Sequence, residues 1–488
     1  MLLALRHREL LSAALLLGLA RTARADPVHH NQVLVGGRAL GMGGAATGLA
    51  EDAASVYYNP AGIAQMRRAS VSASFQVSAF QKIKVDGGLQ AAGLADLTHD
   101  QQPSLAVYVS AIAKVGEQDA NGFRKHALAF STVNPDQIEL SFAGAAKVDD
   151  KFAHLTIDSK DETVWRGLSY AYSLSPRWAL GLSAFWSHRE LKHREAWILA
   201  SDVLPQDYTD REGTVQNAVL TDNLRGDQRA VQLTADAIVL RLGVRHDLTQ
   251  HWRWGLMVQP PGIPLSAGAT ARQERLTFGV DEPDAPRPTY FDSTQPVAAS
   301  SPIPWEVRLG GAYLNEDWTV GLDVMLHGPT GSASDPVVAV GAPPVDPYFG
   351  RAPALPYLLP SSYYTTVVGN VALGIEGVIA GQVPWATGVF TDLSAAAPIT
   401  GPSNSYAWPD VNRFGVTGSL GWRAKGYDIE IGGSLVLGAG DALVVDPEAN
   451  GSVYSQSRWH ERTFTFFISG IQRAVGDLAE NAVKAVLE

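Results

Sequence analysis

The fold is decided by the stretch Gly36-Gly-Arg-Ala-Leu-Gly-Met-Gly-Gly-Ala-Ala-Thr-Gly-Leu-Ala-Glu-Asp-Ala-Ala-Ser-Val-Tyr-Tyr-Asn-Pro-Ala-Gly62. It is too rich in glycine for an ordinary strand or helix, because glycine weakens the interior of both. It ends in an Asn-Pro-Ala-Gly turn signal, and a long series of strand-like segments follows it. We therefore predict a compact plug that enters the lumen of a membrane β-barrel.

The N-terminus carries the signature of a secretory signal. Arg6 and Arg8 form a basic region, an apolar run covers residues 10–20, and an Ala-x-Ala site precedes Asp26. The apolar run is shorter than the ~20 residues that a membrane-spanning helix needs. We predict a signal peptide over residues 1–25, and the alternative is a buried N-terminal helix.

Composition excludes several classes of protein. The formal net charge of the chain is −11, which argues against a nucleic-acid partner. The sequence contains no cysteine, so disulfides and thiolate metal sites are excluded. After the signal there is no apolar run long enough for a membrane helix. The hydrophobic content is nevertheless 46%, with 12 Trp and 15 Tyr. Because membrane helices are excluded, we expect β-strands to carry these apolar residues.

Apolar and polar residues alternate with a period of two along much of the chain. From Trp318 to Leu326, for example, every second residue is apolar. Such segments are about ten residues long, the length that crosses a bilayer at a tilt, although a soluble sandwich also alternates. We predict an all-β fold, a transmembrane antiparallel β-barrel of about 14 strands. The strands are expected near residues 69–79, 105–115, 125–134, 162–174, 177–191, 231–247, 251–259, 303–314, 318–327, 366–380, 384–393, 411–423, 426–438 and 461–470.

The connections between these segments alternate between short and long. Outer-membrane barrels have short periplasmic turns and long outer loops, and an even number of strands leaves both chain ends in the periplasm. A soluble sandwich has no reason to keep this alternation. The long connections are expected near residues 80–104, 135–161, 192–230, 260–302, 328–365, 394–410 and 439–460.

A repeat of the form Leu-x-x-x-Trp-x-x-Gly-Leu occurs with its tryptophan at Trp178, Trp252 and Trp318. Each copy begins at a short turn and enters a predicted strand. Tryptophans at one level, just inside the short turns, are typical of an interfacial aromatic girdle. The alternative is a general preference for aromatic residues at strand starts.

Charged residues within the predicted strands must face the lumen, because a charge toward lipid costs ~2–4 kcal/mol at mid-depth. We expect them to form pairs that hold the plug, and the alternative is that they line a substrate path. The predicted lumen charges are Glu306, Arg308, Asp323, Arg413, Asp428 and Glu430.

The sequence has no enzyme signature. Gly41-Met-Gly43-Gly44-Ala-Ala46 resembles a dinucleotide loop, but a βαβ unit and an acid near residues 61–66 are missing. Residues 188–195 do not form His-Glu-x-x-His, and neither a Gly-x-Ser-x-Gly elbow nor a P-loop occurs. We therefore expect no enzyme activity, no catalytic residue, no metal and no cofactor. The last residues, 471–488, have helical periodicity and are predicted to form an amphipathic helix that packs or docks in the periplasm.

The motif Gly37-Arg-Ala-Leu-Gly-Met-Gly-Gly44, with Asp52 and Tyr57-Tyr-Asn-Pro-Ala-Gly62, resembles the N-terminal hatch signature of the FadL/TodX (OMPP1) outer-membrane transport proteins. The segments Pro304–Gly310 and Pro409–Arg413 resemble strand openings of that family more weakly. The resemblance implies a fourteen-stranded barrel (residues 69–470) plugged by a hatch (residues 26–68). The hatch residues it implies are Gly41, Gly43, Gly44, Asp52, Asn59, Pro60 and Ala61.

The resemblance also implies passive uptake of hydrophobic small molecules, such as long-chain fatty acids or aromatic hydrocarbons, through an outer-membrane channel gated by the hatch. The alternative is a barrel that serves as a protein-secretion or assembly partner, since related barrels in secretion carry a similar signature. An open polar porin would need no plug. The expected partners are a hydrophobic ligand, outer-membrane lipid and lipopolysaccharide, and the barrel-assembly machinery. We expect a monomer.

Overall fold

The computed structural model describes most of the chain between residues 29 and 472. The described residues are 29–31, 33–49, 51–66, 68–89, 95–100, 104–120, 123–148, 151–201, 206–209, 215–218, 223–278, 289–331, 339–340, 364–402, 407–424, 427–446 and 453–472. The predicted signal peptide lies outside them, and so do residues 473–488 of the predicted C-terminal helix. Its first residues, Ile471 and Gln472, belong to the last strand, so the barrel continues past the predicted end at residue 470.

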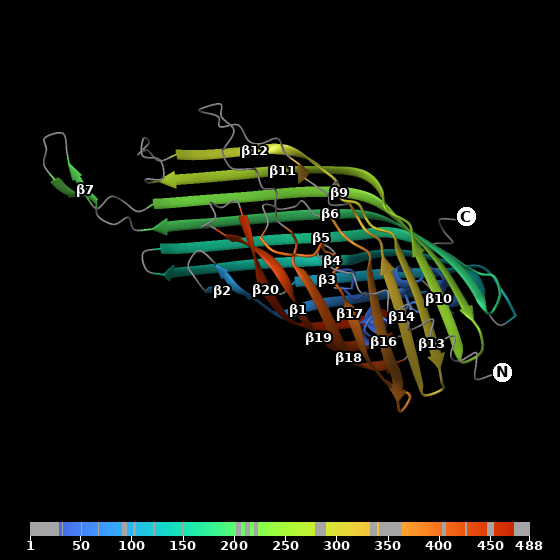
Figure 1. Ribbon diagram of the computed structural model, residues 1–488. Helices are drawn as coiled ribbons and strands as arrows, with labels where there is room; N and C mark the ends of the chain where they lie inside the picture. The colour runs from blue at the N-terminus through green and yellow to red at the C-terminus, as the bar shows by residue number, and fades with distance from the viewer. Residues whose placement is uncertain are drawn as a thin grey trace, which may run out of the picture.

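Most strands join one sheet of eighteen strands, and fourteen of these close it into an antiparallel barrel (Figure 1). The predicted fold class, an antiparallel barrel of about 14 strands, is confirmed. Each wall strand pairs with the next, and β1 pairs with β20 to close the ring. The wall strands are β1 (Ser70–Leu89), β3 (Ser104–Gln118), β4 (Arg124–Val148), β5 (Lys151–Ser173), β6 (Trp178–Ser201), β9 (Asn223–Asp247), β10 (Trp252–Gln259), β13 (Glu306–Leu314), β14 (Trp318–His327), β16 (Val368–Ile379), β17 (Val383–Asp392), β18 (Asp410–Ala424), β19 (Tyr427–Asp446) and β20 (Val453–Gln472).

The outer surface of the barrel is a belt of exposed apolar side chains. In a water-soluble protein such a large apolar surface would be unfavourable, whereas lipid requires it. Trp178, Trp252 and Trp318 are exposed beside the short turns, and Trp178 stacks on His246 with ring centroids 3.9 Å apart. The belt includes Leu180, Leu182, Leu242, Leu309, Leu322, Val324, Leu373, Val389, Val416, Ile431, Leu435, Phe466 and Ile468.

The long connections are partly wrong as predicted, because several of them continue as strands. β4 and β9 have 25 residues each, β6 has 24 and β5 has 23. Beyond the belt the alternation persists with its polarity reversed: on β6, Leu191 and Trp197 are buried inside while Lys192 and Arg194 are exposed outside. Further strands extend this region: β2 (Ala95–Asp100), β11 (Ile263–Phe278), β12 (Thr289–Ala299) and β15 (Ala339–Val340), with a separate hairpin of β7 (Gln206–Thr209) and β8 (Val215–Ala218).

The inner faces of these long strands pack against the far ends of β18–β20 and β1. The contact is an apolar core at the end of the long strands, which we call the outer cluster. It includes Ile83, Phe142, Leu155, Leu191, Trp197, Val231, Leu233, Trp408, Leu443, Tyr454 and Trp459.

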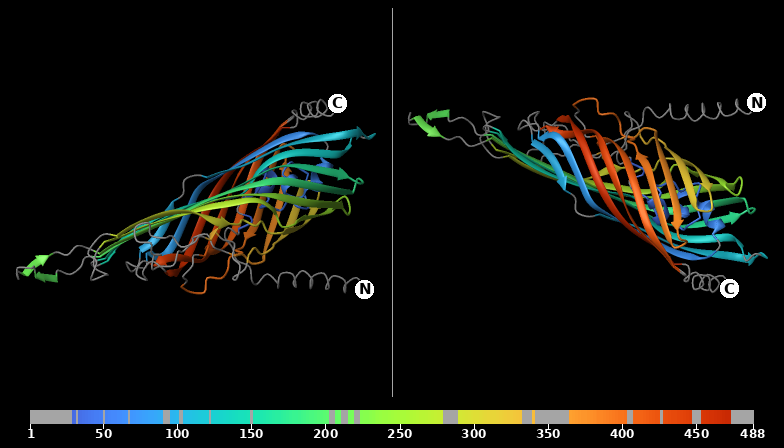
Figure 2. Two further views of the ribbon diagram at one scale, coloured as in Figure 1. Left: turned by 90° about the horizontal axis from the view of Figure 1, so that it is seen from above. Right: turned by 90° about the horizontal axis from the view of Figure 1, so that it is seen from below.

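Residues 29–31, 33–49 and 51–66, which we call the luminal segment, lie inside the barrel (Figures 1 and 2). The segment contains α2 (Gly37–Gly41), α3 (Ser55–Tyr58) and the 3₁₀ helix η1 (Pro60–Gln65). Its buried side chains pack on inward-facing residues of β3–β6 and β9, among them Tyr108, Trp165 and Phe185. No helix among the described residues is long and apolar enough to cross a membrane.

Candidate functional site

Glycines on four adjacent wall strands receive the luminal segment at backbone distance. A Cβ added at Gly181 would lie 2.2 Å from the carbonyl carbon of Pro60, and one at Gly255 would lie 2.2 Å from the oxygen of Thr47. No side chain fits in such a gap, so only glycine permits the approach. We call these positions the glycine seat: Gly181 on β6, Gly243 on β9, Gly255 on β10 and Gly310 on β13.

The glycine seat explains the sequence repeat. In each copy the tryptophan and the glycine are three positions apart, so the two residues point to opposite faces of the strand. Trp178, Trp252 and Trp318 are exposed outside. Gly181, Gly255 and the third glycine, Gly321, meet the luminal segment inside.

Asn59 ties the luminal segment to the wall. Its side chain is fully buried, and its Nδ2 donates to the backbone oxygens of Thr47 at 3.1 Å and Val244 on β9 at 3.0 Å. Its Oδ1 accepts from the backbone N–H of Ala61 at 3.2 Å and caps η1. Pro60 occupies the first turn of η1, where its missing N–H costs nothing.

Two carboxylates fix the middle of the segment. Asp323 on β14 is buried, and its Oδ2 accepts from the backbone N–H groups of Ala46 at 3.0 Å and Thr47 at 2.7 Å. Glu51 of the segment pairs with Arg245 at 2.8 Å and Arg253 at 3.0 Å. Burial opposes ionisation of Glu51, but the two guanidinium groups outweigh it and lower its pKa.

The α2 turn makes a different kind of contact. Arg38 forms a bidentate pair with Glu376 on β16, and Thr417 donates its hydroxyl to the backbone oxygen of Gly41 at 2.7 Å. Burial lowers the pKa of Arg38, but the carboxylate of Glu376 outweighs this effect and raises it.

Glycines in the left-handed region flank α2. Gly36 before it has φ +83°, and Gly43 and Gly44 after it have φ +65° and +88°. Other residues rarely adopt these angles, so the three glycines define the bends at both ends of the turn.

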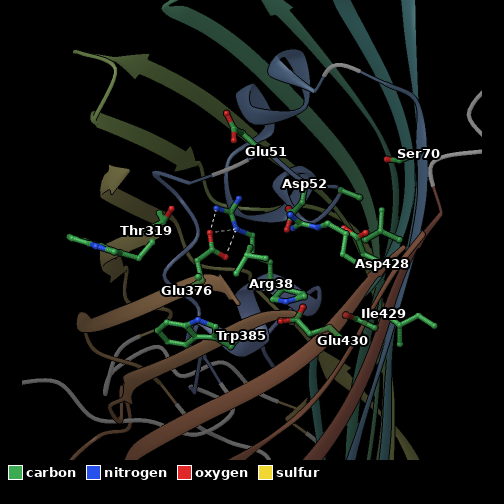
Figure 3. A pocket seen from close by; sticks show the side chains of 18 of the residues that line it. Arg38, Glu51, Asp52, Ser70, Thr319, Glu376, Trp385, Asp428, Ile429 and Glu430 are labelled. Atoms are coloured by element: carbon green, nitrogen blue, oxygen red, sulfur yellow. Dashed lines mark hydrogen bonds and ion pairs between the residues drawn. The ribbon is translucent and has the colours of Figure 1, made fainter. Parts of the chain in front are cut away.

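A cavity of about 740 Å³ lies beside α2 at the short-turn end of the barrel. We call it the vestibule. Figure 3 shows Arg38 at its centre, joined to Glu376, with Asp52, Asp428 and Glu430 around it. Asp428 pairs with Arg423 at 3.5 Å, and Glu430 accepts from the hydroxyl of Ser419 at 2.7 Å. Burial raises the pKa of Asp52.

A smaller cavity of about 120 Å³ lies on the other side of the luminal segment. We call it the upper pocket; its lining includes Tyr57, Trp165, Arg241, Ile303 and Glu306. Arg241 Nη2 donates to Glu306 at 2.7 Å and Nε to Gln259 at 2.9 Å, while its guanidinium carbon lies 4.1 Å from the ring centroid of Tyr57. The charge of Arg241 is therefore neutralised within the pocket.

The remaining predicted charges lie close by. Arg308 pairs with Glu306 and lies over the rings of Tyr57 and Tyr58, at 5.5 Å and 5.3 Å from their centroids. Arg413 is buried on β18, where it pairs with Glu461 at 2.9 Å and its Nη1 lies 2.6 Å from Nδ1 of His29.

Most of the predicted site residues either belong to the luminal segment or lie next to it. Sequence reasoning missed the glycine seat, although its signal was present in the repeat. It also missed Arg241 and Arg245, whose signal was their alternation with Leu240, Leu242 and Val244. The roles of all these residues remain predictions.

Comparison with known proteins identifies the family. A sequence model described as outer membrane protein transport protein (OMPP1/FadL/TodX) matches residues 16–327. A FadL homologue from Pseudomonas aeruginosa has 12% identity and a TM-score of 0.56, covering 93% of this chain and 100% of its own. The toluene transporter TodX from P. putida has 13% identity and a TM-score of 0.55, covering 91% and 99%.

At these identities the two structures show a shared fold, while the sequence model carries the assignment. None of the curated protein sequences compared with the chain matches it significantly. The match of the sequence model covers more than half of the chain, and the fourteen-stranded barrel agrees with it. The chain belongs to the OMPP1/FadL/TodX family of outer-membrane transport proteins.

Proposed function

We propose that this outer-membrane barrel takes up hydrophobic small molecules passively, with long-chain fatty acids or aromatic hydrocarbons as the substrate class, and that the luminal segment acts as its gate. The observation that carries the proposal is the outer cluster, an apolar region in the lumen ahead of a plugged channel. The side chains of this cluster are packed against one another, and we expect an apolar molecule to enter as that packing loosens, because apolar surface leaves water favourably. Family membership supports the same conclusion.

We assign the gating movement to α2. The residues around Asn59 meet the wall backbone to backbone and have no space to move into. The turn Gly37–Gly41 is flanked by glycines at positive φ, is held by the Arg38–Glu376 pair, and borders the vestibule. Its C-cap, Met42, is fixed on the backbone of Gly374 and Gly388, so we expect the movement to pivot there. Swinging α2 into the vestibule breaks one ion pair and one hydrogen bond to the wall, exposes the buried side chains of Ala39 and Leu40, and leaves the seat intact.

The charges along this route favour an uncharged substrate. Arg241 and Arg308 near the upper pocket are paired with Glu306, so neither offers a free cation to a carboxylate. The vestibule beyond α2 is rich in carboxylates and would repel an anionic head group. Within the proposed class, we expect toluene to pass more readily than oleate.

Two engineered disulfides test the proposal, since the chain has no cysteine of its own. Cβ atoms at Gly41 and Ala386 would lie 2.8 Å apart, and those at Ala45 and Gly321 would lie 3.5 Å apart. Disulfides use ~3.5–4.5 Å, so the second pair fits directly and the first needs a shift of roughly 1 Å. The disulfide from Gly41→Cys and Ala386→Cys fixes α2 to the wall. The disulfide from Ala45→Cys and Gly321→Cys instead fixes the residue that follows Gly43 and Gly44, the glycines at positive φ after α2, and leaves α2 free.

Uptake of labelled toluene and oleate is measured in proteoliposomes before and after reduction. We expect the α2 lock to abolish uptake reversibly and the Ala45–Gly321 lock to preserve it. Uptake that survives the oxidised α2 lock would reject α2 as the gate. If folded wild-type protein takes up neither compound, hydrophobic transport is rejected and the secretion or assembly partner gains support. The other expected partners and the monomeric state remain predictions.

A further inference from the structure

The vestibule has an excess of negative charge. Seven carboxylates and three guanidinium groups are found among its described lining residues. Two further arginines, Arg245 and Arg253, contact Glu51 from outside that lining. The carboxylates are Glu51, Asp52, Glu316, Asp317, Glu376, Asp428 and Glu430.

Among the described residues, two of these carboxylates lack a basic partner although both are partly buried. Asp52 accepts hydrogen bonds from the backbone of Ala54 and Ser55, and Glu430 accepts one from the hydroxyl of Ser419. In the described part of the chain, no ion pair joins either group. Arg38, the nearest cation that both groups sense, is already bound to Glu376. Partly desolvated like charges without counter-ions are unfavourable.

A third polar group faces the same space. The side chain of Ser70 on β1 is 3% exposed, its hydroxyl has no hydrogen-bond partner, and it lines the vestibule (Figure 3). An orphan hydroxyl at the wall of a cavity is a ready hydrogen-bond partner for a polar guest. Its position on β1 places this group on a different strand from Asp428 and Glu430 of β19.

The arrangement suits an extended organic cation better than a metal ion. Among the described residues no group of three acidic or histidine side chains is close enough to hold a metal, so the carboxylates are spread around the cavity. Apolar side chains, Met66 and Ile471, are also part of the lining. A lining with both carboxylates and apolar side chains suits a chain in which methylene groups separate ammonium groups.

We propose that the vestibule binds a linear aliphatic polyamine of the spermidine class, with ammonium groups at Asp52, Asp428 and Glu430 and methylene groups over Met66 and Ile471. The ligand bridges the luminal segment and the wall. This binding does not depend on what the barrel transports, and it is measured without any transport assay.

The test is calorimetric titration of spermidine into the full, signal-processed protein in lipid nanodiscs. Asp52→Asn and Glu430→Gln each remove one ligand group with little change of shape, and we expect each to weaken binding at least tenfold. Glu190→Gln is the matched control, because it removes the same charge from an exposed pair with Lys192 on the outer face of β6. The control should bind within twofold of wild type.

Several results would overturn the proposal. Equal weakening in Glu190→Gln, or full displacement of spermidine by Mg²⁺ of the same total charge, would show a diffuse counter-ion effect. Wild-type affinity in folded Asp52→Asn would exclude the vestibule. Folding of each variant is checked by heat-modifiable migration, and because Asp52 lies on the luminal segment and Glu430 on the wall, either variant alone decides the question.

Discussion

Two parts of the luminal segment, the residues around Asn59 and the α2 turn, touch the barrel differently. Around Asn59 the segment meets the glycine seat, where backbone approaches backbone and a Cβ would clash at 2.2 Å. At α2 the turn itself is held by the Arg38–Glu376 pair and the Thr417 hydrogen bond, with the vestibule beside it. Only its C-cap, Met42, meets backbone, that of Gly374 and Gly388, where a Cβ would lie 2.3–2.5 Å away. Close packing without voids transmits strain and resists movement. A contact through long side chains beside a cavity can open at the cost of a few interactions.

The largest expected effect comes from filling the seat. In Gly181→Ala the new methyl would lie 2.2 Å from the backbone of Pro60. This backbone cannot move away as the end of a flexible side chain can. Overpacking typically costs ~1–3 kcal/mol and occasionally more, so we expect a loss of about 3 kcal/mol, read from thermal unfolding in detergent. Gly311→Ala is the control, because a Cβ there meets no atom within 4 Å among the described residues. Equal stability of the two variants would break the comparison.

Asn59→Ala should come next. It removes hydrogen bonds to the oxygens of Thr47 and Val244 and the cap of Ala61, and it leaves buried backbone groups without partners. Each such group costs ~1–3 kcal/mol, and we expect about 2 kcal/mol in total after local relaxation. The measurement is hydrogen exchange of residues 55–66. Unchanged protection there would mean that packing alone holds the seat.

Breaking the pair at α2 should have a smaller effect on stability and a visible one on permeation. Arg38→Gln leaves Glu376 without its partner, and for partly exposed pairs we expect about 1 kcal/mol. Single-channel conductance should rise because α2 leaves the wall more often. The reversed pair, Arg38→Glu with Glu376→Arg, should restore most of the wild-type conductance. A reversed pair that conducts like Arg38→Gln would contradict a role for the ion pair.

The smallest effect concerns pH. The pKa of Glu51 is lowered below its ordinary 4.5, so its pairing with Arg245 and Arg253 stabilises the fold above that value and is lost as pH falls through the lowered pKa. The pKa of Asp52 shifts in the opposite direction, because burial raises it and makes the ionised form of Asp52 unfavourable. At pH 7, Glu51→Gln should be less stable than wild type by up to about 1 kcal/mol. The difference in melting temperature should shrink as pH falls below 4.5 and vanish once pH is below the lowered pKa of Glu51, and a constant difference would assign it to packing.

The strands were predictable because lipid imposes a strict rule. A strand such as Trp318–His327 must show lipid an apolar face and keep Asp323 inside, so a period of two identifies both the strand and its orientation. The same rule does not mark where a strand ends. Beyond the belt, water surrounds the strands and the outer face tolerates exposed charges such as Lys192 and Arg194, so the pattern looks like a polar loop.

The candidate site was less accessible to sequence reasoning. Asn59 could be predicted from its turn signal and Asp323 from its place as a charge within an alternating strand. Their partners could not, because they are backbone groups distant in sequence. Gly181 and Gly255 look like unremarkable small residues on a strand, and only the folded luminal segment reveals why a side chain is not tolerated there. The vestibule depends on groups from several strands, which a single sequence does not bring together.

The long strands of β4, β5, β6 and β9 have one further consequence. A strand of 25 residues spans ~80 Å at ~3.3 Å per residue, and a tilt of ~40° leaves ~60 Å along the barrel axis, against an apolar belt ~25 Å tall. The rim of the barrel is therefore one-sided: the long strands extend some 30 Å or more beyond the belt, whereas β10, β13, β14, β16 and β17, with 8 to 12 residues, are too short to reach that height. A molecule that approaches along the barrel axis thus meets a tall wall on one side only.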